Sequence, residues 1–389
     1  MTKLRSGTTP IPEHCSASSA LPSPRALRSS CPLSPRARQL IRGSRQSIRK
    51  ILDGGDSRLL VIVGPCSIHD SAAALEYALR LKELAGEVSE TLFLAMRVYV
   101  EKPRTATGWK GLVNDPALDG TCRIATGLTV SRQLLTAIAE LGLPTATEAV
   151  DPVAQIYLHD LISWTAIGAR TVESQTHREM ASGLPSPVGF KNGTSGDLKV
   201  AMHAMRACGR PHQFLGIDST GRASIISSAG NRDTHIVLRG GARPNYDSAS
   251  VAACERSLAE HGLRQRIMID CSHANAQKRW QQEPLVMNDA VNQIVKGNRS
   301  IRALLIESHL HAGSQVLAGS GSDLRYGVSI TDECMDWATT EQSLLNIRHQ
   351  LRQILPERLH VPRSPGRARR ATVGSVVLHE GSAGNESWS

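Results

Sequence analysis

The sequence contains 389 residues, and its 45 Lys and Arg outnumber its 35 Asp and Glu, which gives a formal net charge of +10. The excess lies at the two ends, because residues 1–52 carry +9, residues 356–389 carry +2 and residues 53–355 carry −1. A nucleic-acid-binding domain needs a basic face on its folded part, whereas this central region is neutral and the whole chain has only 13 aromatic residues. We therefore expect no nucleic acid among its partners.

Membrane insertion and secretion are disfavoured as well. No apolar run reaches the ~20 residues that span a bilayer, and the N-terminal region lacks a continuous apolar segment followed by a cleavage site. Its Arg- and Ser-rich start is faintly similar to a transit peptide. The eight cysteines are scattered and form no disulfide framework, which is typical of a protein in the reducing cytosol. We expect a cytoplasmic protein with no membrane partner.

The N-terminal region divides into two parts. Residues 1–37 are rich in Pro, Ser and Arg, which predicts an extended or weakly ordered arm. An amphipathic pattern from Ala37 to Leu52 predicts a helix that ends at Gly54-Gly55. We accordingly divide the chain into an N-terminal arm and helix with an interface or regulatory role, a catalytic domain, and a disordered C-terminal tail, at residues 1–52, 53–355 and 356–389.

The central region repeats one pattern, in which a short apolar run precedes a polar residue and then a helical stretch. Eight runs follow it: Leu59–Val63, Leu92–Met96, Thr145–Thr147, Thr165–Gly168, Val188–Phe190, His235–Leu238, Ile267–Ile269 and Ala303–Ile306. Apolar strands that alternate with helices indicate a parallel sheet covered on both faces, and eight such units predict an α/β fold, the (β/α)8 TIM barrel. Residues 212–228 form two short strands around a Gly turn, so we expect an inserted β-hairpin, 212–234, before barrel strand 6.

Polar or charged side chains stand at the end of every predicted strand, where barrel enzymes place their catalytic groups. In chain order they are Cys66, Arg97, Glu148, Arg170, Lys191, Arg239, His273 and Glu307. Any one of them is compatible with a solvated loop or a helix cap, but a complete set on one rim predicts an active site.

Six cations belong to this predicted rim or follow it closely: Arg97, Lys102, Arg104, Arg170, Lys191 and Arg239. Cations that converge in a pocket repel one another unless anions compensate them. Arg side chains bind phosphate and carboxylate through two parallel hydrogen bonds. The expected ligand therefore carries several negative charges, such as two phosphates and a carboxylate.

A thiol, an imidazole and a carboxylate form a second group at the rim, at Cys66, His273 and Glu307, and Asp332 in SITDE is a candidate fourth member. Such a mixed set is typical of a metal site. It is compatible with one divalent ion of Mn, Fe, Co or Zn, and the residue types do not select among them.

Eight long motifs connect the sequence to a known family: VGPCSIHD (63–70), MRVYVEKPRTATGWKGLVNDP (96–116), IGARTVESQTHRE (167–179), PVGFKNGT (187–194), HIVLRGG (235–241), MIDCSHAN (268–275), IESHLHAG (306–313) and YGVSITDE (326–333). They resemble the motifs of the type I 3-deoxy-D-arabino-heptulosonate-7-phosphate (DAHP) synthases, and in particular the amino-acid-regulated bacterial and fungal branch. The resemblance runs from about residue 21 to residue 355.

The resemblance implies the condensation of phosphoenolpyruvate with erythrose 4-phosphate, with release of phosphate. It implies four metal ligands, namely Cys66, His273, Glu307 and Asp332. It implies that phosphoenolpyruvate is bound by Arg97, Lys102, Gly168, Ala169, Arg170, Lys191 and Arg239. Erythrose 4-phosphate would be held by Lys102, Pro103, Arg104 and Thr105.

The same resemblance implies a mechanism. The metal polarises the aldehyde oxygen, C3 of phosphoenolpyruvate attacks the aldehyde carbon, water adds at C2, and phosphate leaves by C–O cleavage. Glu148 lies near the attacking water, and Lys102 is the candidate proton donor to the new alkoxide. The catalytic residues are therefore expected to be Lys102, Glu148, Lys191 and His273.

Regulation is implied as well, because in this branch the arm, the insertion and the loop after the third strand form an effector pocket. On this chain they correspond to Asp151, Phe214 and Gly216. Phenylalanine-sensitive members tend to carry Ser at the position of Gly216, so we expect tyrosine or tryptophan to be the inhibitor. The arm is expected to pack against a neighbouring subunit in a homodimer or homotetramer.

Three other classes of protein agree less well with the sequence than the DAHP synthases do. The 3-deoxy-D-manno-octulosonate-8-phosphate synthases share the barrel and the chemistry, but they lack this arm and the long EKPRTATGWKG motif. A non-catalytic, basic, nucleic-acid-associated protein conflicts with the neutral central region. A degenerate regulatory homologue conflicts with the complete sets of ligands and cations.

Overall fold

The computed structural model describes residues 19–359, apart from 318, 320 and 322. Most of the predicted C-terminal tail lies outside these residues. Ordered structure extends slightly past the expected boundary at 355, because Leu355–Leu359 forms a 3-10 helix in which Leu355 and Arg358 are buried. No helix of the described chain is both long and apolar enough to cross a membrane.

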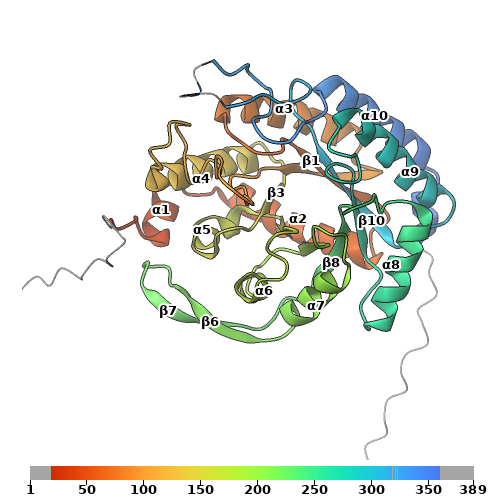
Figure 1. The fold of residues 1–389 in the computed structure, drawn as a ribbon, viewed down its shortest axis with the longest axis horizontal. Coiled ribbons are helices and arrows are strands. Elements are labelled where there is room, and N and C mark those ends of the chain that lie inside the picture. Colours follow the sequence, from red (N-terminus) through yellow and green to blue (C-terminus); the bar gives the residue numbers. More distant parts are fainter. Residues whose placement is uncertain (1–18, 318, 320, 322, 360–389) are drawn as a thin grey trace, which may run out of the picture. The chain divides into compact units, whose positions relative to one another are not determined.

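Eight parallel strands close into a barrel, and their order around it is β1-β10-β9-β8-β5-β4-β3-β2. The predicted (β/α)8 architecture is thereby confirmed, and each predicted run forms one barrel strand (Figure 1). The strands are β1 (Leu59–Gly64), β2 (Leu92–Arg97), β3 (Thr145–Glu148), β4 (Trp164–Ile167), β5 (Val188–Lys191), β8 (Thr234–Leu238), β9 (Ile267–Asp270) and β10 (Ile301–Glu307).

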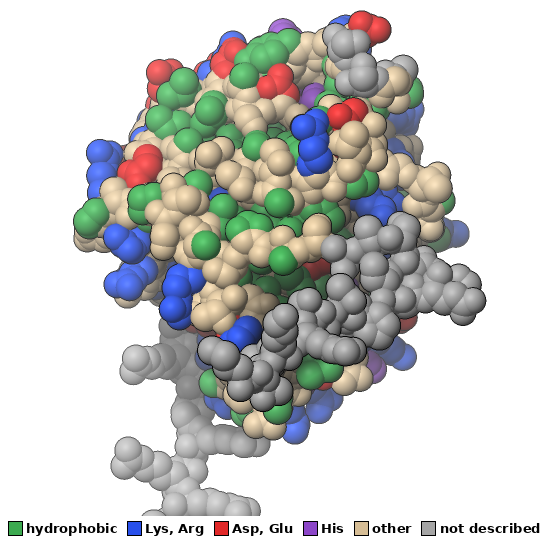
Figure 2. Space-filling model, turned by 90° about the vertical axis from the view of Figure 1, so that its left-hand side faces the viewer, with side chains coloured by type: hydrophobic (Ala, Val, Ile, Leu, Met, Phe, Trp, Pro, Cys, Tyr) green, Lys and Arg blue, Asp and Glu red, His purple; other side chains and the backbone are tan. Residues whose placement is uncertain are grey.

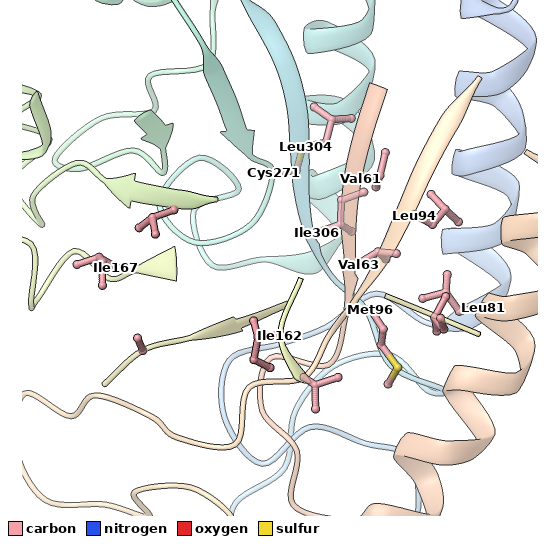
Figure 3. Packing of buried hydrophobic residues seen from close by; sticks show 14 of the residues in the cluster. Val61, Val63, Leu81, Leu94, Met96, Ile162, Ile167, Cys271, Leu304 and Ile306 are labelled. Carbon is pink, nitrogen blue, oxygen red and sulfur yellow. The ribbon is translucent and has the colours of Figure 1, made fainter. Parts of the chain in front are cut away.

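The alternation of side chains along each strand divides the core into two layers. Val61 and Val63 of β1 point outward with Leu94 and Met96 of β2, towards Leu81 of a covering helix (Figure 3). The residues between them face the barrel interior and belong to a separate buried cluster. Because both layers are apolar, the strands read as continuous apolar runs, and each fully buried aliphatic side chain contributes about 1.5–3 kcal/mol.

Eight α-helices cover the outside of the barrel. Most begin at a residue whose side chain accepts hydrogen bonds from the first turn, as Asp70 does from the backbone N–H groups of Ala72 and Ala73. They are α3 (Ser71–Glu87), α4 (Ile124–Glu140), α5 (Pro152–Leu158), α6 (Gln175–Ser182), α7 (Lys199–Cys208), α8 (Ser248–Glu260), α9 (Glu283–Val295) and α10 (Trp337–Leu351).

A long N-terminal helix closes the floor of the barrel. This helix, α2 (Pro35–Asp53), contains the predicted helical segment and ends where Gly54 adopts a left-handed conformation, with φ of 76°. Its Ile48, Ile51 and Leu52 pack with the inward-facing residues of the strands. The amphipathic pattern of α2 therefore serves to fill the end of the barrel opposite the strand-end residues.

A short helix precedes α2 in the stretch that we expected to be extended. This helix, α1 (Pro24–Ser30), starts at Ser23, whose hydroxyl accepts from the N–H of Ala26. Proline at the first helical position and burial of Leu27 stabilise it. The expectation of an extended arm is wrong for this segment, because Pro and Ser there start a helix rather than prevent one.

The inserted hairpin is present before the sixth barrel strand. It consists of the antiparallel strands β6 (His212–Ile217) and β7 (Ala223–Ser228), which form a sheet separate from the barrel (Figure 1). Strand β6 contacts α5 and α6. The hairpin therefore lies beside the helices that follow the third and fourth barrel strands.

Candidate active site

Three side chains with metal-binding atoms meet at the carboxyl ends of the barrel strands, and a fourth lies close to one of them. The Cys66 Sγ and carboxylate oxygens of Glu307 and Asp332 all lie within 4.8 Å of one another. The fourth predicted ligand, His273, is outside this group of three, but its Nε2 lies 3.6 Å from Oε1 of Glu307. The strand register explains why Cys66 and Glu307 are close, since β1 pairs with β10 so that Gly64 lies beside Glu307.

The electrostatics of this cluster fit a bound metal ion. Oε2 of Glu307 is buried and has no hydrogen-bond partner within the described residues. Burial raises the pKa of the Cys66 thiol, and the negative charge of Glu307 raises it further, although the nearby Lys102 acts in the opposite direction. A divalent cation would satisfy the unpaired oxygen and favour the thiolate, so the residues present are suited to holding one.

Arg97 lies directly beneath the cluster and is fully buried. Its Nη2 donates to Oε1 of Glu307 over 2.7 Å and to the carbonyl of Cys66 over 3.1 Å. Its guanidinium lies over the ring of Tyr99, 3.5 Å from the ring centroid. The contacts of Arg97 are therefore with two of the candidate metal ligands and the barrel interior.

Asp270 connects His273 to Lys191, and sequence reasoning missed it. This fully buried carboxylate accepts hydrogen bonds from Nζ of Lys191 at 3.0 Å and from Nδ1 of His273 at 3.0 Å. Burial alone would raise the pKa of Asp270, but His273 and Lys191 outweigh it and hold this pKa well below its ordinary value. Asp270 ends β9, so its position at a strand end could have revealed it, but His273 was taken as the residue of that strand.

A cavity of about 270 Å³ opens beside the cluster and contains most of the predicted cations. Every predicted substrate-binding residue except Arg97 lines it, together with His273 and Asp332. Four further lining residues were not predicted: Thr107, Thr194, Lys278 and Thr331. Lys278 follows His273 by five residues in a turn with left-handed backbone, for which the strand-end pattern gives no signal.

The segment after β2 carries Lys102, Pro103, Arg104 and Thr105 over the cavity. Nζ of Lys102 lies 3.2 Å from both the Sγ and the carbonyl oxygen of Cys66, which joins this segment to the candidate metal site. Oγ1 of Thr105 accepts from Nε of Arg170 over 2.7 Å, and Nε of Arg104 donates to the carbonyl of Trp109 over 2.8 Å. The segment thus contacts both the β1 and the β4 sides of the rim.

The place of Glu148 depends on a glycine. A Cβ added at Gly168 would lie 2.0 Å from Oε1 of Glu148, far inside van der Waals contact. Gly168 follows β4, which pairs with β3, so the two residues end neighbouring strands. The missing side chain at Gly168 makes room for the carboxylate at the cavity wall.

The predicted effector residues lie outside the lining of this cavity. Asp151 begins α5, where its side chain accepts from the backbone N–H groups of Val153 and Ala154. Phe214 and Gly216 lie on β6, which contacts α5. The three residues are therefore on neighbouring elements at the hairpin side of the barrel.

Fold and site together define a (β/α)8-barrel protein with a candidate metal centre beside a strongly cationic cavity. The sequence profile of the DAHP synthetase I family matches residues 32–345. The chain belongs to this family, which confirms the resemblance and favours it over the octulosonate alternative.

Named relatives cover nearly the same length. The Tyr-sensitive phospho-2-dehydro-3-deoxyheptonate aldolase of Escherichia coli K12 is 51% identical over 346 residues, 89% of this chain and 97% of that protein. The Phe-sensitive protein of the same organism is 48% identical over 329 residues, 85% of this chain and 94% of that protein. The structure of phospho-2-dehydro-3-deoxyheptonate aldolase from Francisella tularensis SCHU S4 matches with a TM-score of 0.85 at 42% identity, covering 88% of this chain and 99% of that one.

Proposed function

We propose that the chain catalyses the condensation of phosphoenolpyruvate with D-erythrose 4-phosphate, giving DAHP and inorganic phosphate. This is the 3-deoxy-7-phosphoheptulonate synthase reaction, the transferase step that begins the shikimate pathway. One observation carries the proposal: His273 and Asp332 share the walls of a single cavity with Lys102, Arg104, Arg170, Lys191 and Arg239. The substrate pair carries two phosphates and a carboxylate, which is the charge that such a cavity needs.

Four side chains would hold one divalent metal ion: Cys66, His273, Glu307 and Asp332. A bound ion supplies Lewis-acid polarisation of the aldehyde. Because Nδ1 of His273 donates to Asp270, its Nε2 keeps the lone pair that a ligand requires. The donor set is compatible with Mn, Fe, Co and Zn.

Phosphoenolpyruvate would be bound by Arg170, Lys191 and Arg239, with Gly168 and Ala169 forming the wall between them. Lys191 is buried, so solvent screens its positive charge only weakly. This charge would stabilise the phosphate as it leaves. Arg97 would add positive charge from beneath and hold Glu307 in place.

Erythrose 4-phosphate would lie against Lys102, Pro103, Arg104 and Thr105. The Lys102 ammonium stands 3.2 Å from the Cys66 sulfur, so it is placed to give a proton to an alkoxide that forms beside the metal ligands. Glu148 would orient the water that adds to C2, from the opposite wall. His273 contributes as a metal ligand.

Inhibition by an aromatic amino acid is part of the proposal, with a pocket around Asp151, Phe214 and Gly216 on the hairpin side. Tyrosine or tryptophan is favoured over phenylalanine as the effector, because Gly216 lacks the side chain that phenylalanine-sensitive members tend to carry. We further propose a homodimer or homotetramer in the cytoplasm, with the N-terminal arm at a subunit interface.

A single assay tests the central proposal. Purified full-length protein, loaded in turn with Mn²⁺, Fe²⁺, Co²⁺ or Zn²⁺, is expected to consume phosphoenolpyruvate only when erythrose 4-phosphate is present. Removal of the metal with a chelator is expected to abolish consumption, and its return to restore it. Failure of every metal-loaded form to turn over would overturn the proposal.

A further inference from the structure

A second cavity, which shares no lining residue with the candidate active site, lies between the N-terminal helices and the segment after α5. It has a volume of about 370 Å³. Five arginines line it, against one acid, Asp160: Arg28, Arg38, Arg42, Arg45 and Arg132. Four apolar residues complete the walls: Pro32, Leu33, Ile41 and Pro185. The excess of four positive charges in one cavity is the feature to be explained.

The single acidic residue of the cavity, Asp160, already forms ion pairs. Arg132 is almost fully buried and binds both oxygens of Asp160, at 2.8 and 2.9 Å. Nε of Arg28 lies 3.7 Å from the same carboxylate. Asp160 therefore pairs with Arg132 and Arg28, and its single negative charge cannot balance the five arginines of the cavity.

The other three arginines have no acidic partner among the described residues. Arg45 donates only to backbone carbonyls, those of Ile162 and His159, at 2.9 and 2.7 Å. Burial and the nearby cations Arg49 and Arg42 lower the pKa of Arg45 to about 10, although the negative charge of Asp160 acts in the opposite direction. Arg38 and Arg42 are exposed on the same helix, α2, and within the described chain make no ion pair. The cavity mouth therefore presents positive charge without compensation.

Three residues that line the cavity also carry a buried, unpaired polar atom behind its wall. Nδ1 of His159, Nε of Arg28 and Nε of Arg132 are buried without a hydrogen-bond partner in the described structure. Burial and the positive charge of Arg28 lower the pKa of His159 to about 4, so its imidazole is neutral at physiological pH. These atoms are enclosed by protein, so the donors that an anion in the cavity would meet are the guanidinium groups of the less buried arginines, Arg38, Arg42 and Arg45.

We infer that this cavity binds a small organic carboxylate with a compact apolar body and no ammonium group. The carboxylate would pair with Arg38, Arg42 and Arg45, and the apolar body would lie against Leu33 and Ile41. An ammonium group would meet arginines on every side, because Asp160 is occupied, so a zwitterionic amino acid fits less well. The side of the molecule that carries α1 faces the viewer in Figure 2, where Lys and Arg side chains gather beside hydrophobic ones.

Calorimetric titration of the full-length protein with phenylacetate tests the inference. Phenylacetate has the required charge and body, whereas 2-phenylethylamine keeps the body and reverses the charge, and inorganic phosphate keeps the charge without the body. We expect the wild type to bind phenylacetate at one site and not to bind 2-phenylethylamine there. Arg38→Ala/Arg42→Ala is expected to weaken phenylacetate binding by about tenfold or more.

The control is Arg36→Ala, which removes an exposed arginine from the same helix but outside the cavity. It is expected to bind phenylacetate as the wild type does. Absence of phenylacetate binding, or binding equal in all three proteins, would overturn the inference. Phosphate binding that is lost in the double variant while phenylacetate does not bind would also overturn it, in favour of a phosphate site. A change of oligomeric state in the double variant without ligand binding in the wild type would assign the cavity to a subunit contact instead.

Discussion

The ammonium group of Lys191 donates a hydrogen bond of 3.0 Å to the carboxylate of Asp270, and both side chains are shielded from solvent. The same carboxylate accepts a hydrogen bond from His273, so it connects a residue proposed to bind phosphoenolpyruvate with a proposed metal ligand. Displacement of Asp270 would therefore disturb both halves of the site together.

Asp270→Asn keeps the volume of the side chain and removes its charge. We expect Mn²⁺ affinity to fall by about 10–100-fold, because the amide no longer fixes the imidazole of His273. The kcat/KM for phosphoenolpyruvate should fall as well, since Lys191 loses its ion pair. Calorimetry with Mn²⁺ and steady-state kinetics measure the two effects. Asp160→Asn, which disturbs an ion-paired carboxylate outside the site, should leave Mn²⁺ affinity unchanged.

Cys66→Ser replaces the soft donor of the candidate metal site by a weak oxygen ligand. We expect metal affinity to fall by about 100-fold or more, and activity to fall with it at limiting metal. Metal content after dialysis, measured by mass spectrometry, reports the loss. Cys254→Ser alters another buried thiol, in α8, and should retain metal. Equal metal content in both variants would remove Cys66 from the ligand set.

Gly168→Ala places a methyl group where Oε1 of Glu148 now lies. The carboxylate must move, so we expect kcat to fall by about tenfold or more while Mn²⁺ affinity stays the same. Gly43→Ala provides the control, because an added Cβ there meets no atom within 4 Å. On helix α2 this control should raise stability by about 0.5–1 kcal/mol and leave kcat unchanged.

Gly216→Ser tests the proposed effector pocket. A Cβ at this position would lie 2.7 Å from Cγ1 of Ile226 on β7, so the hairpin must adjust. We expect the inhibition constant for tyrosine to rise about tenfold or more without a change in kcat. Gln213→Ala, at an exposed position of the same strand, should be inhibited like the wild type. If phenylalanine alone inhibits the wild type, the expectation of tyrosine or tryptophan is wrong.

His235 is expected to make the fold sensitive to acid. It is fully buried, and Nε1 of Trp164 donates to its Nε2, while burial and Arg266 lower its pKa from 6.5 to about 3. The unfolded chain therefore takes up a proton below pH 6.5 that the folded chain does not. The contribution of His235 to the free energy of unfolding should be fully present above that pH and should be lost as pH drops from 6.5 towards 3. Between pH 7 and pH 5 the loss should be about 2 kcal/mol.

Urea unfolding at pH 7 and pH 5 measures this loss. His235→Gln keeps an acceptor for Trp164 but cannot be protonated, so its stability should fall by about 2 kcal/mol less than that of the wild type over the same interval. A replacement at the exposed His349 should leave the wild-type pH dependence unchanged. Identical pH dependence of His235→Gln and the wild type would show that His235 does not contribute.

The barrel was predictable because its strands are buried on both faces and therefore appear as uniform apolar runs. The rim was predictable because parallel strands bring their carboxyl ends together, which is why Cys66 and Glu307 meet although their sequence positions are far apart. Asp270 was missed although it ends β9, because His273 was taken as the polar residue of that strand. Helix α1 was missed because Ser23 and Pro24 are also typical of extended segments.

The closure of the barrel floor by α2 has a consequence for how the chain folds during synthesis. The ribosome produces Ile48, Ile51 and Leu52 first, whereas β10, which packs on the same helix, emerges near the end of translation. The apolar face of α2 can therefore form its complete set of native contacts only after most of the polypeptide has been synthesised. Such long-range pairing predicts late, slow completion of the native state, with a nascent segment that benefits from chaperone protection in the meantime.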